Sequence, residues 1–275
     1  MAVASCDSAR PSASGDGLRL GVVSDASRAD PRYEPLSAYL TATLGVEVEF
    51  DIRATTEDLL AGFDRGEFSV AWLDSLAFVS AERDNGAAAL AVRGVDLDAT
   101  SEFLTSRADG QRLADFAGSS FCFGPRLSTS GHLMPRAYLA ILGLDPETQF
   151  RDVQYSKSHE ETTSRLLAGS ADLAVLESDE VTRLFELGVL DSAKFRRVAR
   201  TPPFRNFLFA VSPELSRSTR SSLLDALLAL NPENANHREA LESLGADYFL
   251  PAYSSLFEKV RTTAPLVLHA TQEVR

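Results

Sequence analysis

Apolar runs and helix-type patterns alternate along the chain from Leu18 onward. In chain order they predict a strand at Leu18 to Val23, a helix at Tyr33 to Leu44 that ends at Gly45, a strand at Val46 to Phe50, a helix capped by Thr56 and ending near Gly66, and a strand at Phe68 to Leu73. Because strands and helices follow one another in this order, the pattern predicts a parallel sheet covered by helices.

A second set of elements follows the polar segment from Thr105 to Gly110. It predicts a short helix at Leu113 to Phe116, a strand at Ser120 to Phe123, a helix at Ser130 to Leu142, a strand at Gln149 to Tyr155, a helix at Glu160 to Ala168 and a strand at Ala171 to Leu176. The apolar run Phe207 to Val211 then predicts a strand that returns to the first set. Helices are expected after it, around Ser218 to Leu230 and His237 to Leu244.

We therefore expect an α/β protein of two lobes, with residues 18–104 and 205–275 in the first lobe and residues 105–204 in the second. Each lobe should contain a mixed, mostly parallel sheet with flanking helices. The chain would cross between the lobes near Thr100 to Thr105 and near Arg200 to Asn206, and the two crossings would form a hinge. Ligands of doubly wound folds bind where strands end and helices begin, so the site is expected in the cleft between the lobes.

The first 17 residues have the small, polar composition of a flexible tether. Within them, Val3-Ala4-Ser5-Cys6 reads like the cleavage box of a bacterial lipoprotein, with Cys6 as the lipid-bearing residue. The charged and apolar segment that precedes such a box is missing. Either the precursor is longer than this sequence and the protein is extracytoplasmic and lipid-anchored, or the match is coincidental and the protein is cytoplasmic.

Composition excludes several classes of function. The formal net charge of −12 would repel nucleic acid over most of the surface. Only Cys6 and Cys122 are present, and no Cys or His cluster has metal-ligand spacing, so no metal site is predicted. The chain also lacks a Gly-x-Ser-x-Gly elbow. We therefore expect no catalytic residue and no cofactor. We also expect the protein to be a monomer.

The most informative segment runs from Phe121 to Arg136 and reads as strand, glycine turn, three hydroxyl residues and helix. Ser128, Thr129, Ser130 and Gly131 stand where the first backbone N–H groups of the helix have no internal partner. Uncommitted amides, hydroxyl groups and the helix dipole would converge there on one tetrahedral oxyanion. The alternative is an ordinary Ser/Thr cap.

At this segment the chain resembles the PhnD-like phosphonate-binding proteins of ABC transporters. The resemblance extends from Leu18 to Phe257 and rests on Tyr33-Glu34-Pro35-Leu36, Val70-Ala71-Trp72-Leu73, Ser128-Thr129-Ser130-Gly131 with Pro135-Arg136, Ser158-His159-Glu160 and Thr201-Pro202-Pro203. It implies a two-lobed periplasmic-binding-protein fold of type II, an extracytoplasmic location and an ABC permease as partner. It also implies that Ser128, Thr129 and Ser130 hold the oxygens of a phosphonate, phosphate or phosphite, and that His159 faces the same anion.

The chain departs from the family pattern at several positions, where it carries Glu57, Asp74, Ser75, Phe78 and Phe207. Glu177 keeps an acidic character that in the family can meet a ligand amine. We hypothesise that the anion cradle is retained and the rest of the pocket is retuned, with Asp74, Glu57 or Glu177 available to a cationic or hydroxyl group. The alternative is that these acids are solvated surface residues.

Trp72 is the only tryptophan. It ends a predicted strand at the cleft edge, where it serves either as a core residue or as part of the site together with Asp74 and Ser75. A competing hypothesis for the whole chain is a cytoplasmic enzyme of the lyase type, acting on a small carboxylate with Asp74 as base. A sensory module is less favoured, because no transmembrane or kinase segment is recognisable.

Overall fold

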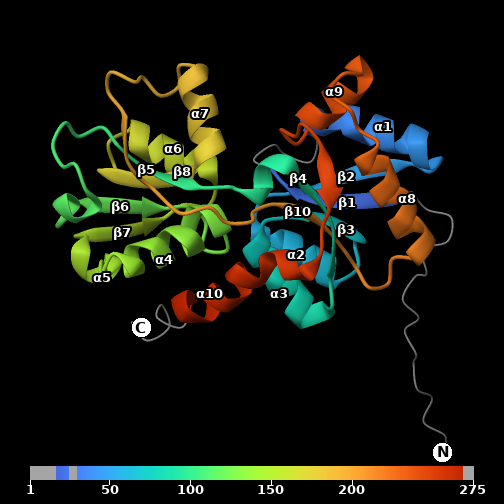
Figure 1. Cartoon of the computed structure of the whole chain (residues 1–275), viewed down its shortest axis with the longest axis horizontal. Coiled ribbons are helices and arrows are strands. Elements are labelled where there is room, and N and C mark those ends of the chain that lie inside the picture. The colour runs from blue at the N-terminus through green and yellow to red at the C-terminus, as the bar shows by residue number, and fades with distance from the viewer. Residues whose placement is uncertain (1–16, 25–29, 269–275) are drawn as a thin grey trace, which may run out of the picture.

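The computed structural model describes residues 17–24 and 30–268, and shows two lobes, each built on one β-sheet with flanking helices (Figure 1). The sheet of the first lobe has the strand order β11-β4-β10-β3-β1-β2. Its strands are β1 (Leu18–Val23), β2 (Val48–Arg53), β3 (Val70–Leu73), β4 (Ala88–Arg93), β10 (Leu208–Val211) and β11 (Phe249–Pro251). The strands β1 to β4 run in one direction and β10 and β11 in the other, so the sheet is mixed, as predicted.

Helices cover both faces of this sheet, which explains why its strands are continuous apolar runs. Val70 and Trp72 pack on one face together with residues of α1 (Glu34–Leu44), α8 (Arg217–Leu228) and α9 (Ala235–Glu242). Ala71 and Leu73 pack on the other face with α2 (Thr56–Asp64), α3 (Ser75–Asn85) and α10 (Glu258–Leu268). The remaining 3-10 turns of this lobe are η1 (Pro31–Tyr33), η2 (Gly94–Leu97) and η5 (Ser254–Phe257).

The sheet of the second lobe has the order β7-β6-β8-β5-β9 and occupies the left of Figure 1. Its strands are β5 (Ser101–Thr105), β6 (Ser120–Phe123), β7 (Asp152–Tyr155), β8 (Leu173–Glu177) and β9 (Arg196–Arg200). Its helical elements are η3 (Leu113–Phe116), the π-helical turn η4 (Thr129–Leu133), α4 (Met134–Ile141), α5 (Pro146–Gln149), α6 (His159–Leu167) and α7 (Ser178–Glu186). Within the described residues no helix combines the length and the apolar character that crossing a membrane requires.

Three sequence-based expectations need correction. Strand β5 pairs with β8 and β9, so residues 101–104, assigned above to the first lobe, belong to the second. The N-cap of α2 is Thr55 and not Thr56, because the Thr55 side chain accepts the hydrogen bond from the Asp58 N–H. The helices α3, α7 and α10 were not predicted, although their apolar faces pack on the sheets. Cys6 and the proposed tether up to Asp16 lie outside the described residues.

The two segments that cross between the lobes pair with each other. Ala99 and Phe204 form an isolated antiparallel bridge, in which the Phe204 N–H donates to the Ala99 carbonyl at 2.9 Å. Further along, the Asn206 N–H donates to the Asp96 carbonyl. Because the crossings are bonded to each other, they form one double-stranded connection between the lobes.

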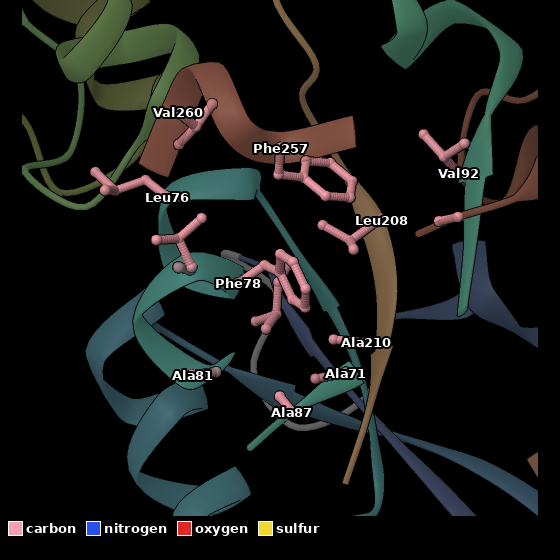
Figure 2. Close-up of a cluster of buried hydrophobic side chains, with 14 of the residues drawn as sticks. Ala71, Leu76, Phe78, Ala81, Ala87, Val92, Leu208, Ala210, Phe257 and Val260 are labelled. Carbon is pink, nitrogen blue, oxygen red and sulfur yellow. The ribbon is translucent and has the colours of Figure 1, made fainter. Parts of the chain in front are cut away.

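A shared hydrophobic cluster joins the lobes on one side of this connection. Leu76 and Phe78 of α3 pack there with Phe257 and with Val260 of α10 (Figure 2). The same cluster includes Leu133 and Met134 of the second lobe. The helix α10 therefore contacts α3 in the first lobe and α4 in the second.

Candidate ligand-binding site

A cavity of about 640 Å³ lies between the lobes, lined by residues of both. The first lobe contributes Trp72 and Asp74, at and just after the end of β3, and the second contributes Ser128, His159 and Glu177. The second-lobe residues follow the carboxyl ends of β6 and β7 or end β8. The cavity therefore lies where doubly wound folds bind ligands. The other predicted site residues, Ser75, Thr129, Ser130 and Gly131, are buried beside it without lining it.

The turn after β6 is held in shape by its own backbone and by two glycines. Ser128 is the N-cap of η4, and its hydroxyl accepts a hydrogen bond from the Gly131 N–H at 2.9 Å. The Gly124 N–H donates to the Gly131 carbonyl, and a Cβ atom on Gly131 would lie 2.9 Å from the Gly124 Cα. This close approach requires glycine at both positions. Of this turn, Pro125 and Ser128 line the cavity.

The hydroxyl groups of Thr129 and Ser130 are committed to carboxylates, contrary to the expectation that they are free. The Thr129 hydroxyl donates to Asp74 Oδ1 at 3.1 Å and accepts from the Leu76 N–H at 2.8 Å. The Ser130 hydroxyl donates to Glu177 Oε2 at 3.4 Å. An oxyanion can hydrogen-bond to these two hydroxyls only if it displaces Asp74 or Glu177 or binds directly beside them.

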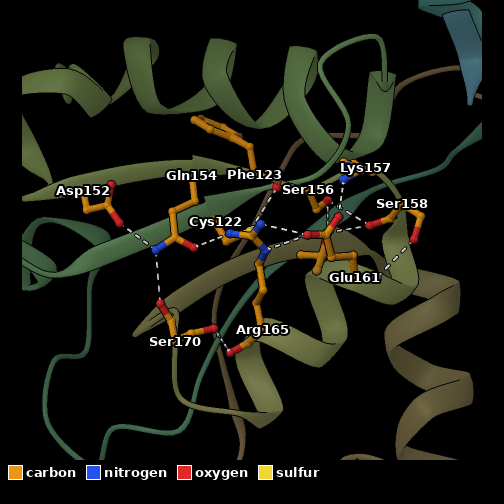
Figure 3. Close-up of polar contacts among 11 residues, drawn as sticks. Cys122, Phe123, Asp152, Gln154, Ser156, Lys157, Ser158, Glu161, Arg165 and Ser170 are labelled. Carbon is orange, nitrogen blue, oxygen red and sulfur yellow. Dashed lines mark hydrogen bonds and ion pairs between the residues drawn. The ribbon is translucent and has the colours of Figure 1, made fainter.

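His159 occupies the first position of α6, after a turn held by hydrogen bonds. Ser158 caps the helix by accepting from the Glu161 N–H, and the Glu161 carboxylate accepts from the Lys157 N–H and pairs with Arg165 (Figure 3). His159 Nε2 lies 3.4 Å from the Ser128 hydroxyl, so the first turns of two helices meet here.

The His159 ring is neutral at physiological pH. Burial lowers the pKa of His159, because the charged imidazolium would lose its solvation. Its Nδ1 atom is buried and has no hydrogen-bond partner among the described residues. The ring therefore retains one uncommitted polar atom beside the cavity.

Asp74 and Glu177 are acids whose burial favours the protonated form. Asp74 is 7% exposed, and burial raises its pKa to about 6 although hydrogen bonds from Ala77 and Thr129 favour the carboxylate. Burial and the neighbouring negative charge of Asp96 raise the pKa of Glu177 to about 8. Glu177 also accepts a hydrogen bond from the Asn206 side chain at 2.8 Å. At neutral pH Glu177 therefore carries a proton, and Asp74 is close to its titration range.

A family model described as the phosphonate periplasmic substrate-binding protein of ABC transporters matches residues 20–257. The chain belongs to this family. It is 22% identical over 258 residues to a probable ABC transporter phosphite-binding protein, PhnD1, of Prochlorococcus marinus, covering 88% of this chain and 87% of the relative. Membership in this family of phosphonate-binding proteins favours a binding protein over the enzymatic alternative.

Solved structures of phosphonate-binding proteins share the fold. The structure of Prochlorococcus marinus PhnD1 in complex with methylphosphonate superposes with a TM-score of 0.82 at 21% identity, covering 90% of this chain and 97% of that one. A binding protein component of an ABC phosphonate transporter from Pseudomonas aeruginosa gives a TM-score of 0.80 at 18% identity, covering 92% and 87%. At this identity the likeness establishes the two-lobed fold of type II.

The departures from the pattern of phosphonate-binding proteins fall in different environments. Glu57 is exposed on α2 and does not line the cavity, which agrees with the surface alternative. Phe78 is a core residue that packs edge-on against Phe257, with ring centroids 5.1 Å apart. Phe207 and Asp74 do line the cavity. The hypothesis that the pocket differs in specificity from that of its relatives therefore concerns Asp74, Phe207 and Glu177.

Several charged residues of the cavity were not predicted from the sequence. Its basic side chains are those of Arg32, Arg93, Lys157 and Arg183, and its acidic ones are those of Asp74, Glu160, Glu177, Asp179, Glu180 and Glu242. Three of the basic residues are paired, Arg32 with Asp30, Arg93 with Asp96 and Arg183 with Glu180. Arg93 ends β4, a strand that the sequence pattern did not predict. No motif in the sequence pointed to the other basic residues of the cavity. No group of three or more metal-binding side chains occurs in the part of the chain that the structure describes.

Proposed function

We propose that this protein binds a small phosphorus oxyanion, of the phosphonate, phosphite or phosphate class, in the interlobe cavity and presents it to an ABC permease. One observation carries the proposal: Ser128 and His159, at the first turns of η4 and α6, meet at 3.4 Å on the cavity wall. Helix amino ends provide N–H donors and a partial positive charge, so they bind anions without a cationic side chain.

The relatives support this choice of ligand. One relative is named a probable phosphite-binding protein, and the structure with a TM-score of 0.82 contains methylphosphonate. In this chain Ser128-Thr129-Ser130-Gly131 lies at the start of η4, beside the cavity. The predicted roles of Ser128, Thr129 and Ser130 rest on this position.

Binding requires no bond-making. The anion would dock on the second lobe at Ser128 and His159, and the first lobe would complete the enclosure with Asp74 and Trp72. A conformation that offers both sets of contacts is favoured once the anion is bound, because only there does the ligand interact with both lobes. The paired crossing segments provide the hinge for this closure, and a permease would recognise the closed form.

Attachment to the membrane is a separate part of the proposal. It rests on Val3-Ala4-Ser5-Cys6 and on the extracytoplasmic location of the family. We expect metabolic labelling with a fatty acid to modify the native protein and not the Cys6→Ser variant. Equal labelling of both proteins, or of neither, would remove the lipid anchor from the proposal.

The ligand is tested by calorimetry with methylphosphonate, phosphite, phosphate and 2-aminoethylphosphonate. We expect at least one to bind, and Ser128→Ala to weaken it by about tenfold or more, the equivalent of one lost hydrogen bond to a charged group. The control is Ser222→Ala, which removes an exposed hydroxyl on α8. Absence of binding to all four ligands would overturn the proposed function.

A further inference from the structure

The Asp74 carboxylate lies between the amino ends of two helices that belong to different lobes. As the N-cap of α3, Asp74 accepts from the Ala77 N–H at 3.0 Å. Across the lobe boundary it accepts from the Thr129 N–H at 3.2 Å and from the Thr129 hydroxyl at 3.1 Å. Asp74 therefore already accepts two hydrogen bonds from Thr129, in the turn at which the oxyanion is proposed to bind.

Within the described residues Asp74 forms no ion pair, and its hydrogen bonds come from N–H and hydroxyl donors alone. Ionisable groups on the neighbouring elements are engaged elsewhere or exposed: Arg261 of α10 pairs with Glu82, His132 of η4 contacts the Arg126 carbonyl, Arg205 before β10 pairs with Asp98, and Glu57 and Asp58 of α2 are exposed. The rest of the cavity lining holds neutral His159 and Glu177 and both acidic and basic side chains. Of the basic ones, Arg32, Arg93 and Arg183 pair with other carboxylates, and Lys157 forms no ion pair with Asp74. A second full negative charge beside Asp74 would therefore meet repulsion in a poorly solvated site.

We propose that Asp74 shares one proton with the bound oxyanion, and that this residue thereby selects oxyanions that can carry a proton. The inference rests on the proposed function and adds a specificity-determining residue to it. The proton lies on a P–OH group that donates to Asp74, or on the Asp74 carboxyl group, which then donates to an oxygen of the guest. The raised pKa of Asp74, about 6, already places its carboxyl group close to neutral pH.

The selectivity follows from the acidity of the guest. A phosphoryl group has an ionisable proton that titrates close to neutral pH, so it can supply the shared proton itself. A sulfonate is permanently deprotonated in this range, and its binding must take the proton from solvent onto Asp74. Methylphosphonate and methanesulfonate have similar size and tetrahedral shape. Comparing their binding therefore separates the effect of the ligand's ionisable proton from the effects of size and shape.

Calorimetry of both ligands at a series of pH values tests the proposal. From about pH 6 to pH 7 we expect the affinity of the native protein for methanesulfonate to fall towards tenfold per pH unit, and that for methylphosphonate to fall much less. In Asp74→Asn, which keeps an N-cap residue, methanesulfonate binding should lose this pH dependence and strengthen at neutral pH. The control, Asp58→Asn, removes an exposed carboxylate from α2 of the same lobe.

A second measurement needs no variant. Calorimetry in two buffers of different ionisation enthalpy counts the protons taken up, and near pH 7 we expect close to one for methanesulfonate and fewer for methylphosphonate. Equal proton uptake by the two ligands, or a ligand preference that Asp74→Asn leaves unchanged, would overturn the inference while leaving the proposed function intact. Failure to bind any oxyanion at any pH would instead overturn the proposed function.

Discussion

Trp72 and Phe207 stack face to face, with ring centroids 5.6 Å apart and ring planes 9° from parallel. Trp72 belongs to β3, whereas Phe207 lies in the second crossing segment, one residue before β10. Both rings line the cavity, and the Arg93 guanidinium lies over both. The pair therefore connects the wall of the cavity to a segment that crosses between the lobes.

Ligand binding should change the fluorescence of Trp72. Because Trp72 is the only tryptophan, its emission reports the environment of this pair alone. We expect methylphosphonate to shift or quench the emission with the same midpoint as calorimetric binding, and Phe207→Ala to reduce the change. Phe185→Ala, on α7 outside the cavity lining, is the control. Heat of binding without any change in emission would contradict this prediction.

Thr129→Val should lower both stability and affinity. The substitution removes the hydroxyl that bridges Asp74 and the Leu76 N–H, and we expect a loss of about 1–2 kcal/mol in the free energy of unfolding. Because this contact joins the lobes beside the site, ligand affinity should also fall by about tenfold.

The matched control is Thr105→Val, because the Thr105 hydroxyl donates to the Asp172 carbonyl inside the second lobe. It should lower the stability and leave the affinity unchanged. Denaturant unfolding and calorimetry check the pair of variants. An equal loss of affinity in both would show that Thr129 acts only through stability.

Glu177→Gln should remove a pH dependence of stability. With its folded-state pKa raised from 4.5 to about 8, Glu177 keeps its proton in the folded protein while the unfolded chain releases it. Its contribution to stability is therefore present below the unfolded pKa and is lost as pH rises through the folded one. We expect the glutamine variant to be more stable than the native protein at alkaline pH, by about 1 kcal/mol or more, and equally stable in acid.

Thermal unfolding across this pH range measures the effect of Glu177→Gln. The exposed Glu186, on α7, provides the control substitution Glu186→Gln. Parallel stability curves for the native protein and Glu177→Gln would argue that Glu177 is ionised in the folded state.

The joint substitution Arg197→Ala and Arg200→Ala should destabilise the second lobe strongly. Glu102 of β5 has a side chain that is 0% exposed, and both arginines of the neighbouring β9 pair with it. Without them the carboxylate is buried and uncompensated, which typically costs about 3 kcal/mol or more. Arg112→Ala, whose partner Asp115 is on the surface, should cost under about 1 kcal/mol in the same denaturation experiment. Similar losses in both proteins would contradict the prediction.

The amino-acid sequence by itself determined the local elements and the region of the site. Alternating apolar residues and glycine stops predicted β1, α1, β6 and β10, and the φ of 69° at Gly45 is the left-handed geometry expected of a helix end. The rule that ligands bind where strands end predicted the Ser128 turn as part of a cleft. The resemblance to phosphonate-binding proteins added His159, Asp74 and Glu177. The elements and the turn could be predicted because each depends on the periodicity or the chain order of neighbouring residues.

Only the tertiary structure decided what those residues contact. Asp74 and Thr129 are 55 positions apart, and Glu177 and Ser130 are 47 apart, so no local pattern relates them. The assignment of β5 to the second sheet likewise depends on its pairing with β8 and β9. Long-range pairing is selected by packing and by the satisfaction of buried polar groups over the whole fold. This is why the hydrogen bonds from the Thr129 and Ser130 hydroxyls to acids could not be predicted from the sequence.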